Sequence, residues 1–423
     1  MKRQRSFICI DLKSFYASVE CVERGLDPFK TNLVVADPTR SKSTICLAIT
    51  PAMKSLGVKN RCRIHQIPEG IDYITAMPRM QLYIDYSARI YSIYLRYVSK
   101  EDIHVYSIDE CFMDVTDYLT LYHMTEKEMA VELMRAVMDE TGITAAAGIG
   151  TNLYLAKVAM DIVAKHVDDH IGILNEISYR KQLWDHRPLS DFWRIGSGTE
   201  RKLDGYGIHT MGDIAYTSIT SEDWLYKMFG IDAELLIDHA WGLEYCSMSD
   251  IKNYHAEEHS LSNGQVLMRN YSFEEAVIVV REMTDVLVLD LVSKGLITSS
   301  VTLWIAYDHK FERAPSHGTV RFTSPTNSSG KIMDAVEQLY MQITDCYMGI
   351  RRIEICANRV TAEGYQQYDL FTDPQIIEKE KNLQKAVLNI KKRYGKNAIM
   401  RGANLLDCST YRERNNQIGG HRA

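Results

Sequence analysis

Residues 104–117 read HVYSIDECFMDVTD and place two adjacent acids, Asp109 and Glu110, between two apolar segments. The flanking segments, 104–108 and 111–115, are short and rich in β-branched and aromatic residues, which predicts two neighbouring strands. The acids therefore lie where one strand passes into the next. This stretch alone leaves two interpretations open: a solvated turn, or a pair of carboxylates that holds a divalent cation.

The segments around this strand pair predict an α+β sheet. Residues 6–10 (SFICI) form an apolar run typical of a buried strand that ends at Asp11, and 143–149 (ITAAAGI) predict a strand of small residues. Helical spacing of apolar residues predicts helices at 80–98, 127–140 and 152–165. The order strand, helix, strand pair, helix, strand, helix indicates a ferredoxin-like unit with helices on one face and a long insertion after the first strand.

Composition limits the class of protein. The 423 residues, 46% of them hydrophobic, are too many for one core and predict two to four domains. No apolar run approaches the ~20 residues of a membrane span, and the N-terminus lacks the features of a secretory signal. The nine cysteines include no CxxC pair, which argues against a zinc site or a disulfide framework and favours the reducing cytoplasm.

The net charge is −6, but the chain contains two basic clusters. Residues 38–68 contain no acid, and residues 379–401 contain a single acid, Glu380. Each alone could be a solvated surface, but two in an acidic chain favour a phosphate-bearing partner. Gly196, Ser197, Gly198 and Thr199 open a predicted helix and would present main-chain N–H groups to a phosphate. The region 255–359 predicts a second α+β unit, and the chain after residue 363 resembles an appendage with a lysine-rich helix.

Asp11 joins the acidic pair if the sheet is ferredoxin-like, because the first strand then lies beside the strand that follows Glu110. Three neighbouring carboxylates repel one another and raise each other's pKa unless a cation neutralises them. Oxygen donors without His or Cys select Mg²⁺ or Mn²⁺, and a pair of such ions serves phosphoryl transfer.

Three segments resemble signature segments of the Y-family DNA polymerases, the translesion enzymes. These segments are IDLKSFYASVE (10–20), YSIDECFMDVT (106–116) and AGIGTNLYLAKVAMDIVAK (147–165). PRMQLY (78–83), HSLSNGQVL (259–267) and ERNNQIGGH (413–421) further resemble the UmuC-type branch of Gram-positive bacteria. The resemblance implies translesion synthesis and error-prone repair within an SOS-type damage response.

The resemblance also implies a multidomain, right-hand architecture with a ferredoxin-like palm, small fingers, a helical thumb and an α+β little finger. The implied boundaries are palm 1–12 and 79–174, fingers 13–78, thumb 175–243, little finger 255–362 and a C-terminal tail 363–423.

In such an enzyme Asp11, Asp109, Glu110 and the main-chain carbonyl of Leu12 would hold two Mg²⁺ ions. A primer 3′-hydroxyl would attack the α-phosphate of a deoxynucleoside triphosphate and release pyrophosphate. Tyr16 matches the steric gate, whose ring would clash with a ribose 2′-hydroxyl. The alternative for Tyr16 is an ordinary core tyrosine.

Lys157 and Lys54 match residues of the family that reach the triphosphate. The alternative for Lys157 is a surface lysine paired with Asp161 one helical turn away. Pro51 stands where many members have Tyr or Asn, and proline offers neither an N–H nor a polar side chain. We therefore expect a neighbouring group such as Thr50 to make that contact.

The implied partners are primer–template DNA, the β sliding clamp of DNA polymerase III and accessory repair proteins. The segment QYDLF resembles the peptide with which bacterial polymerases bind that clamp, through Gln367, Asp369, Leu370 and Phe371. An exposed Leu-Phe pair in a polar linker is otherwise unexplained. The alternative is that this segment folds back on its own little finger.

Two other functions compete with the polymerase. A non-catalytic regulator that binds clamp and DNA would tolerate loss of the three acids, yet the sequence has all of them. A nucleotide cyclase uses a similar palm and two metals, but it does not explain the Gly-Ser-Gly segment, the second α+β unit or QYDLF.

Overall fold

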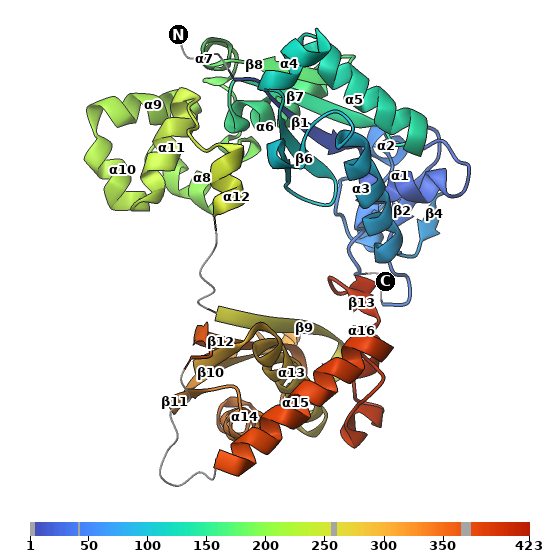
Figure 1. Cartoon of the computed structure of the whole chain (residues 1–423), viewed down its shortest axis with the longest axis vertical. Coiled ribbons are helices and arrows are strands. Elements are labelled where there is room, and N and C mark those ends of the chain that lie inside the picture. The colour runs from blue at the N-terminus through green and yellow to red at the C-terminus, as the bar shows by residue number, and fades with distance from the viewer. Residues whose placement is uncertain (1–4, 41–42, 255–259, 365–373) are drawn as a thin grey trace. The chain divides into compact units, whose positions relative to one another are not determined.

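The computed structural model describes residues 5–40, 43–254, 260–364 and 374–423. The chain forms two compact units, Met1–Tyr254 and His255–Ala423. Figure 1 shows the two units with their elements labelled where there is room, and each unit is described by itself.

The first unit is built on a five-stranded sheet in the order β5-β6-β1-β7-β8. Its strands are β1 (Phe7–Leu12), β5 (Ile103–Val105), β6 (Glu110–Asp114), β7 (Ala145–Gly150) and β8 (Ile171–Leu174). The first strand, β1, is antiparallel to both β6 and β7 and lies at the centre. The order β5-β6-β1-β7 confirms the ferredoxin-like arrangement, which β8 extends by pairing parallel to β7.

Helices cover both faces of this sheet, so the expectation that they share one face is wrong. On one face, α6 (Leu153–Asp161) packs with Phe7 and Cys9. On the other, α3 (Met80–Tyr94) approaches Leu12 and Cys111. The approach of α6 depends on glycine, because a Cβ at Gly150 would lie 2.2 Å from the Ala156 main-chain nitrogen.

The rest of the first unit consists of a small sheet and a set of helices. The small sheet has the order β3-β2-β4 and comprises β2 (Leu33–Val35), β3 (Ala48–Ile49) and β4 (Ile74–Ala76). The remaining α-helices are α1 (Phe15–Val22), α2 (Pro51–Ser55), α4 (Thr116–Tyr122), α5 (Glu126–Thr141), α7 (Glu176–Leu183), α8 (Ser197–Asp204), α9 (Met211–Thr220), α10 (Glu222–Phe229), α11 (Asp232–Trp241) and α12 (Met248–Asn253).

The second unit is a four-stranded antiparallel sheet in the order β11-β10-β12-β9, with two long helices on one face. Its elements are β9 (Ser260–Tyr271), α13 (Phe273–Lys294), β10 (Leu296–Tyr307), β11 (Ser316–Thr326), α14 (Ser329–Ile343) and β12 (Ile350–Ala362). Alternate residues of β10 are buried beneath α13 and α14, including Val301, Leu303 and Ile305. This alternation is typical of a sheet with one covered face.

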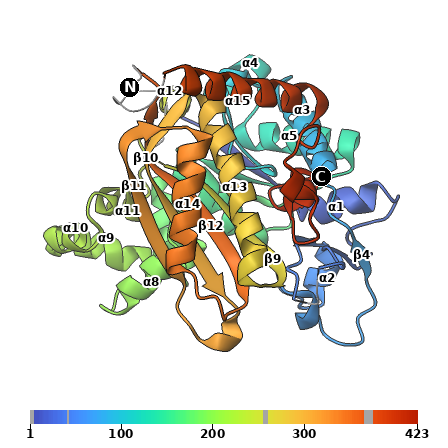
Figure 2. The ribbon, with the colours of Figure 1, turned by 90° about the horizontal axis from the view of Figure 1, so that it is seen from below.

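The C-terminal tail belongs to the second unit, so the expectation of an appendage is wrong. It contains α15 (Pro374–Tyr394), α16 (Tyr411–Asn415) and the short strands β13 (Gln417–Ile418) and β14 (His421–Arg422). Figure 1 and Figure 2 show α15 crossing α13 and α14. The buried Glu282 of α13 accepts hydrogen bonds from the Asn404 side chain (3.1 Å), the Thr410 main chain (3.1 Å) and the Ser409 hydroxyl.

The described residues include no helix both long and apolar enough to cross a membrane. All nine cysteines have free thiols, and five of them are buried.

Candidate active site

Pairing between β1 and β6 brings the predicted carboxylates to one place. Asp11 and Glu110 are direct partners in the antiparallel register, so their side chains lie on the same face of the sheet. The Leu12 N–H donates to the Asp109 carbonyl (3.0 Å), which fixes the turn before β6. Glu110 is the first residue of β6, at a strand end as the sequence predicted, and Asp11 is the penultimate residue of β1.

Ser107 organises this turn, and sequence reasoning did not single it out. Its hydroxyl donates to Asp109 Oδ1 (2.7 Å), and its oxygen accepts from the Glu110 N–H (3.1 Å). A serine two or three residues before paired acids is a recognisable signal, because its side chain can bond to nearby main-chain groups. Ser107 therefore holds Asp109 and Glu110 in their relative positions.

The carboxylates influence one another strongly. Burial, followed by the charges of Asp109 and Glu110, raises the pKa of Asp11 to about 7. Burial also raises the pKa of Glu110, although Lys157 opposes this shift. Such mutual repulsion makes the site favourable for a cation.

Lys157 supplies one cation. Its Nζ donates to Glu110 Oε1 (2.7 Å) and to Asp161 Oδ1 (3.0 Å), and its side chain is only 6% exposed. Burial alone would lower the pKa of Lys157, but Asp161 and Glu110 raise it above its ordinary value. The pairing with Asp161 is present, yet Lys157 is a buried residue of the carboxylate cluster and not a surface lysine.

In the ranges that the structure describes, no three His, Cys, Asp or Glu side chains are close enough together to enclose a metal ion. Glu110 is held by Lys157 instead. The predicted donor set nevertheless fits a hard divalent cation, because all three side chains are carboxylates and their repulsion already disfavours a fully ionised Asp11.

The turn between β1 and α1 adds two residues that sequence reasoning missed, although both lie inside the first signature segment. Burial lowers the pKa of Lys13 to about 8, with Asp11 opposing this effect and Lys54 adding to it. Ser14 has a left-handed backbone (φ 50°, ψ 41°), and its hydroxyl is buried without a hydrogen-bond partner among the described residues. Strain of this kind costs about 1–3 kcal/mol and is typical of functional turns.

Tyr16 lies on α1 next to the carboxylates. Its ring stacks on Tyr83, with ring centroids 4.5 Å apart and planes inclined by 17°. Burial and the charge of Asp109 raise the pKa of Tyr16. Tyr16 is only half-buried, which distinguishes it from an ordinary core tyrosine.

Tyr83 is fixed by the buried carboxylate of Glu20. Tyr83 Oη donates to Glu20 Oε1 (2.8 Å), and Arg79 donates to both carboxylate oxygens (2.9 and 2.8 Å). This network joins α1 to α3 and so sets the position of the ring on which Tyr16 rests.

The expectation that Thr50 makes the triphosphate contact in place of Pro51 is wrong. Its hydroxyl is fully buried, donates to the Thr31 carbonyl (2.8 Å) and accepts from the N–H groups of Leu33 and Met53. It therefore caps α2 from inside and cannot replace the contact that Pro51 lacks. Lys54, one turn further along α2, is exposed.

The segment from Gly196 to Thr199 forms the exposed N-terminus of α8. Gly196 precedes the helix and supplies no side-chain cap, and a Cβ placed on Gly196 or Gly198 would meet no atom within 4 Å. A helix N-terminus of this kind can bind a phosphate, and the assignment of this one to a phosphate stays a prediction. The proposed clamp residues lie outside the described residues: Gln367, Asp369, Leu370 and Phe371.

Two family models match the chain. The model of the impB/mucB/samB family matches residues 10–161, and the model of that family's C-terminal domain matches 258–370. The two matches include Asp11, the whole of β6 and the sheet of the second unit, and together they span more than half of the chain. The chain belongs to this family, that of the Y-family DNA polymerases.

Relatives of the family match over the full length. A Bacillus subtilis protein named for UV-damage repair, UvrX, is 29% identical and aligns over 99% of this chain and 98% of its own. DNA polymerase IV 2 of the same organism is also 29% identical, over the whole of both chains. A Y-family DNA polymerase chimera of known structure has a TM-score of 0.63 at 20% identity, covers 84% of this chain and 99% of its own, and supports the fold.

Proposed function

We propose that this protein is a template-directed DNA polymerase for translesion synthesis and error-prone repair. It adds deoxynucleoside monophosphates to a primer 3′-hydroxyl and releases pyrophosphate. The observation that carries this proposal is the direct register of Asp11 with Glu110, beside Asp109 and Lys157, in a chain of this family. Full-length relatives named DNA polymerase IV support it.

The proposed division of labour follows the two units. Residues 1–12 and 79–174 act as the palm, 13–78 as the fingers and 175–243 as the thumb, whose α8 N-terminus holds a backbone phosphate. Residues 255–362 act as the little finger, whose open sheet face carries Arg352 stacked over Trp304. Contacts from such a face go mainly to phosphates and position the duplex without reading its sequence.

We further propose that Asp11, Asp109, Glu110 and the Leu12 carbonyl hold two Mg²⁺ ions, for which Mn²⁺ can substitute. When bound, such ions activate the attacking oxygen and neutralise phosphate charge. Ser107 keeps Asp109 in position. Lys157 uses two of its three N–H donors on carboxylates and offers the third to a triphosphate oxygen.

Tyr16 serves as the steric gate of this polymerase. Two observations support this proposal: the Tyr16 ring stacks on Tyr83, and the charge of Asp109 acts on the Tyr16 hydroxyl. A ribose 2′-hydroxyl would meet the ring, whereas a deoxyribose would not. Lys13 and Lys54 add positive charge beside Asp11, where the triphosphate would lie.

The clamp peptide remains part of the proposal. Docking of residues 367–371 on the β clamp would raise the local concentration of the polymerase at the primer and offset a weak grip on DNA. A peptide of residues 363–373 should bind the clamp, and Leu370→Ala with Phe371→Ala should abolish binding. Wild-type peptide that fails to bind would remove the clamp from the account. A cytoplasmic location fits the nine free thiols.

The function is tested by primer extension on templates that differ only in the base opposite the first insertion. The proposal expects each template base to direct one deoxynucleotide, and expects Asp109→Ala to abolish extension while Asp85→Ala, a control on exposed α3 surface, retains it. A product formed without template would favour a cyclase-like reaction. Binding of DNA without extension by the wild type would favour the non-catalytic regulator.

A further inference from the structure

The helix α15 presents two different sides. Its inner side faces α13 and α14 and helps to line a cavity of about 550 Å³, to which it contributes Glu380, Leu383, Gln384, Val387 and Lys391. Gln384 is buried and donates to the Asn327 carbonyl (3.2 Å). Glu380 accepts from the Ser328 hydroxyl (2.8 Å) and from the Gly330 N–H (3.0 Å) at the start of α14. The helix is thus fixed on the unit from one side.

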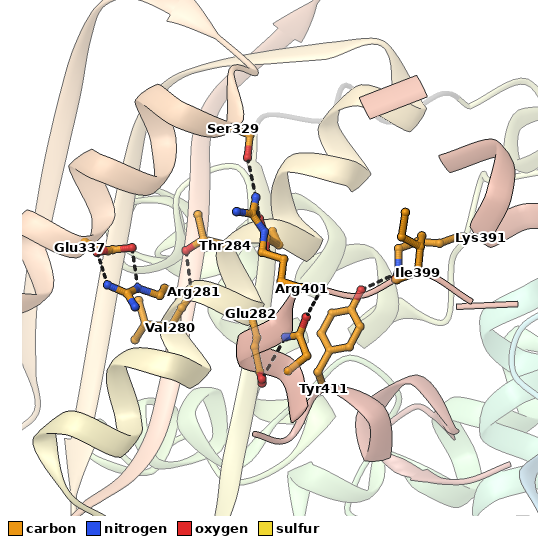
Figure 3. A network of polar contacts seen from close by, with 12 residues as sticks. Val280, Arg281, Glu282, Thr284, Ser329, Glu337, Lys391, Ile399, Arg401 and Tyr411 are labelled. Carbon is orange, nitrogen blue, oxygen red and sulfur yellow. Dashed lines mark hydrogen bonds and ion pairs between the residues drawn. The ribbon is translucent and has the colours of Figure 1, made fainter. Parts of the chain in front are cut away.

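Two lysines of α15 are used for this attachment. Lys381 forms an ion pair with Glu363 (2.6 Å). Lys391 Nζ donates to the carbonyls of Lys396 (2.7 Å) and Ile399 (2.8 Å) and to Tyr411 Oη (2.7 Å). Figure 3 shows the bond to Tyr411 within the polar network that anchors the tail. These two cations are occupied within the unit.

The outer side of α15 carries basic side chains that do not help to attach the helix to the unit. Lys379, Lys385, Lys392 and Arg393 are all exposed, and none forms an ion pair with a described residue. Asn382 and Asn389 are exposed between them. Glu378 is the one acid on the exposed side of this helix, so a strongly positive strip remains in a chain whose net charge is −6.

We propose that this outer face of α15 binds the phosphate backbone of single-stranded DNA. The cations extend from Lys379 to Arg393, a rise of about 21 Å at 1.5 Å per residue. A single strand that follows the helix can place several phosphates along that length. The intervening asparagines can donate further hydrogen bonds to phosphate or sugar oxygens.

The position of α15 favours a single strand over a duplex. The helix lies on α13 and α14, which cover one face of the sheet, whereas the proposed duplex site is the opposite face. Duplex DNA is stiff over ~150 base pairs and cannot turn from one face to the other within one small unit. A single strand can make that turn. The inference rests on the proposed function only in taking DNA as the polyanion.

The test compares two full-length variants that lose the same charge. In the first, Lys379, Lys385, Lys392 and Arg393 are all changed to Gln. In the control, four exposed cations that are already paired with acids are changed to Gln: Lys30, Lys100, Lys127 and Arg135. Binding of a fluorescent dT30 oligonucleotide is measured from 50 to 300 mM NaCl, beside extension of a primer on a template with a short overhang.

We expect the α15 variant to bind dT30 more weakly and to lose about 0.7 per abolished contact from the slope of log K against log salt, or about 2–3 in all. The control should keep the wild-type slope, and both variants should extend the short substrate at the wild-type rate. An unchanged slope in the α15 variant, or an equal loss in both variants, would overturn the inference.

Two further probes exclude other partners. If the α15 substitutions weaken binding of poly-L-glutamate or of blunt duplex DNA but not of dT30, the surface serves an acidic protein or a duplex and the inference is wrong. A wild type that binds dT30 through α15 but never extends a primer would refute the proposed polymerase and leave this surface standing.

Discussion

At the scale of single residues, the site depends on where charge is buried. Asp11 and Glu110 face each other across two strands, and Lys157 neutralises part of their charge. Tyr16 lies beside this cluster with its ring held against Tyr83. The signature segments predicted Asp11, Glu110, Lys157 and Tyr16, because each belongs to a short motif, but they did not predict the role of Tyr83. Ser14 could not be predicted, since its strained backbone appears only when β1 and α1 are both placed.

Tyr16→Ala should raise incorporation of ribonucleotides relative to deoxynucleotides by at least about tenfold. This factor corresponds to removal of a steric penalty of ~1.4 kcal/mol that the Tyr16 ring imposes on a ribose. The measurement is the ratio of kcat/KM for the two nucleotides on one primer–template. Tyr86→Ala, at a half-exposed position of α3, is the matched control. Unchanged sugar selectivity in Tyr16→Ala would remove its assignment as the gate.

At the scale of elements, apolar runs predicted β1, β6 and β7 to within two or three residues, because buried strands have a clear pattern. The strand β9 escaped prediction. It lies at the edge of its sheet, buries only Leu267 and Tyr271, and contains an Asn-Gly pair that is typical of turns. The sequence could not show that α6 covers the opposite face from α3, since this depends on the close approach permitted at Gly148 and Gly150.

The contact between α1 and α3 predicts a dependence of stability on pH. Burial alone would raise the pKa of Glu20, but hydrogen bonds from Arg79, Arg24 and Tyr83 bring it below its ordinary 4.5. Since the ionised form is favoured in the folded protein, this stabilisation is complete above pH 4.5 and is lost as the pH falls through the lower folded value. Arg79 is 41% exposed, so solvent screens part of the interaction.

Glu20→Gln should therefore lower the free energy of unfolding by about 1–2 kcal/mol at pH 7, after allowance for that screening. The difference from the wild type should shrink as the pH drops below 4.5. Urea titrations at several pH values measure it. A deficit that stays constant down to pH 3 would show that the charge of Glu20 contributes nothing.

At the scale of the whole molecule, two α+β units were predicted from two separate series of strands and helices, but the place of the tail was not. The Glu282 carboxylate accepts hydrogen bonds from residues more than 120 positions later in the chain, and no local sequence pattern reveals such a contact. The sequence showed the positive charge of α15. The structure shows which of its lysines bond to other residues of the unit and which are exposed without an ion pair.

Glu282→Ala should release the tail from α13. Four hydrogen bonds to a buried carboxylate are lost, and each such bond is worth about 1.5–3 kcal/mol. Residues 399–414 should therefore exchange their amide hydrogens faster and become sensitive to trypsin. Glu274→Ala, at an exposed position of the same helix, should leave exchange unchanged. Equal protection in the two variants would show that Glu282 does not hold the tail.

The central claim is that Asp11, Asp109 and Glu110 perform nucleotidyl transfer. Its most direct test is the single-turnover rate of deoxynucleotide incorporation with Mg²⁺ for the wild type and for Asp109→Asn, with the Kd for primer–template measured on the same samples. We predict a rate lower by about 10²–10³-fold, the order of magnitude lost when a single electrostatic contact is removed from an enzyme's reaction centre, and an unchanged Kd. A variant that incorporates nucleotides at the wild-type rate would contradict it.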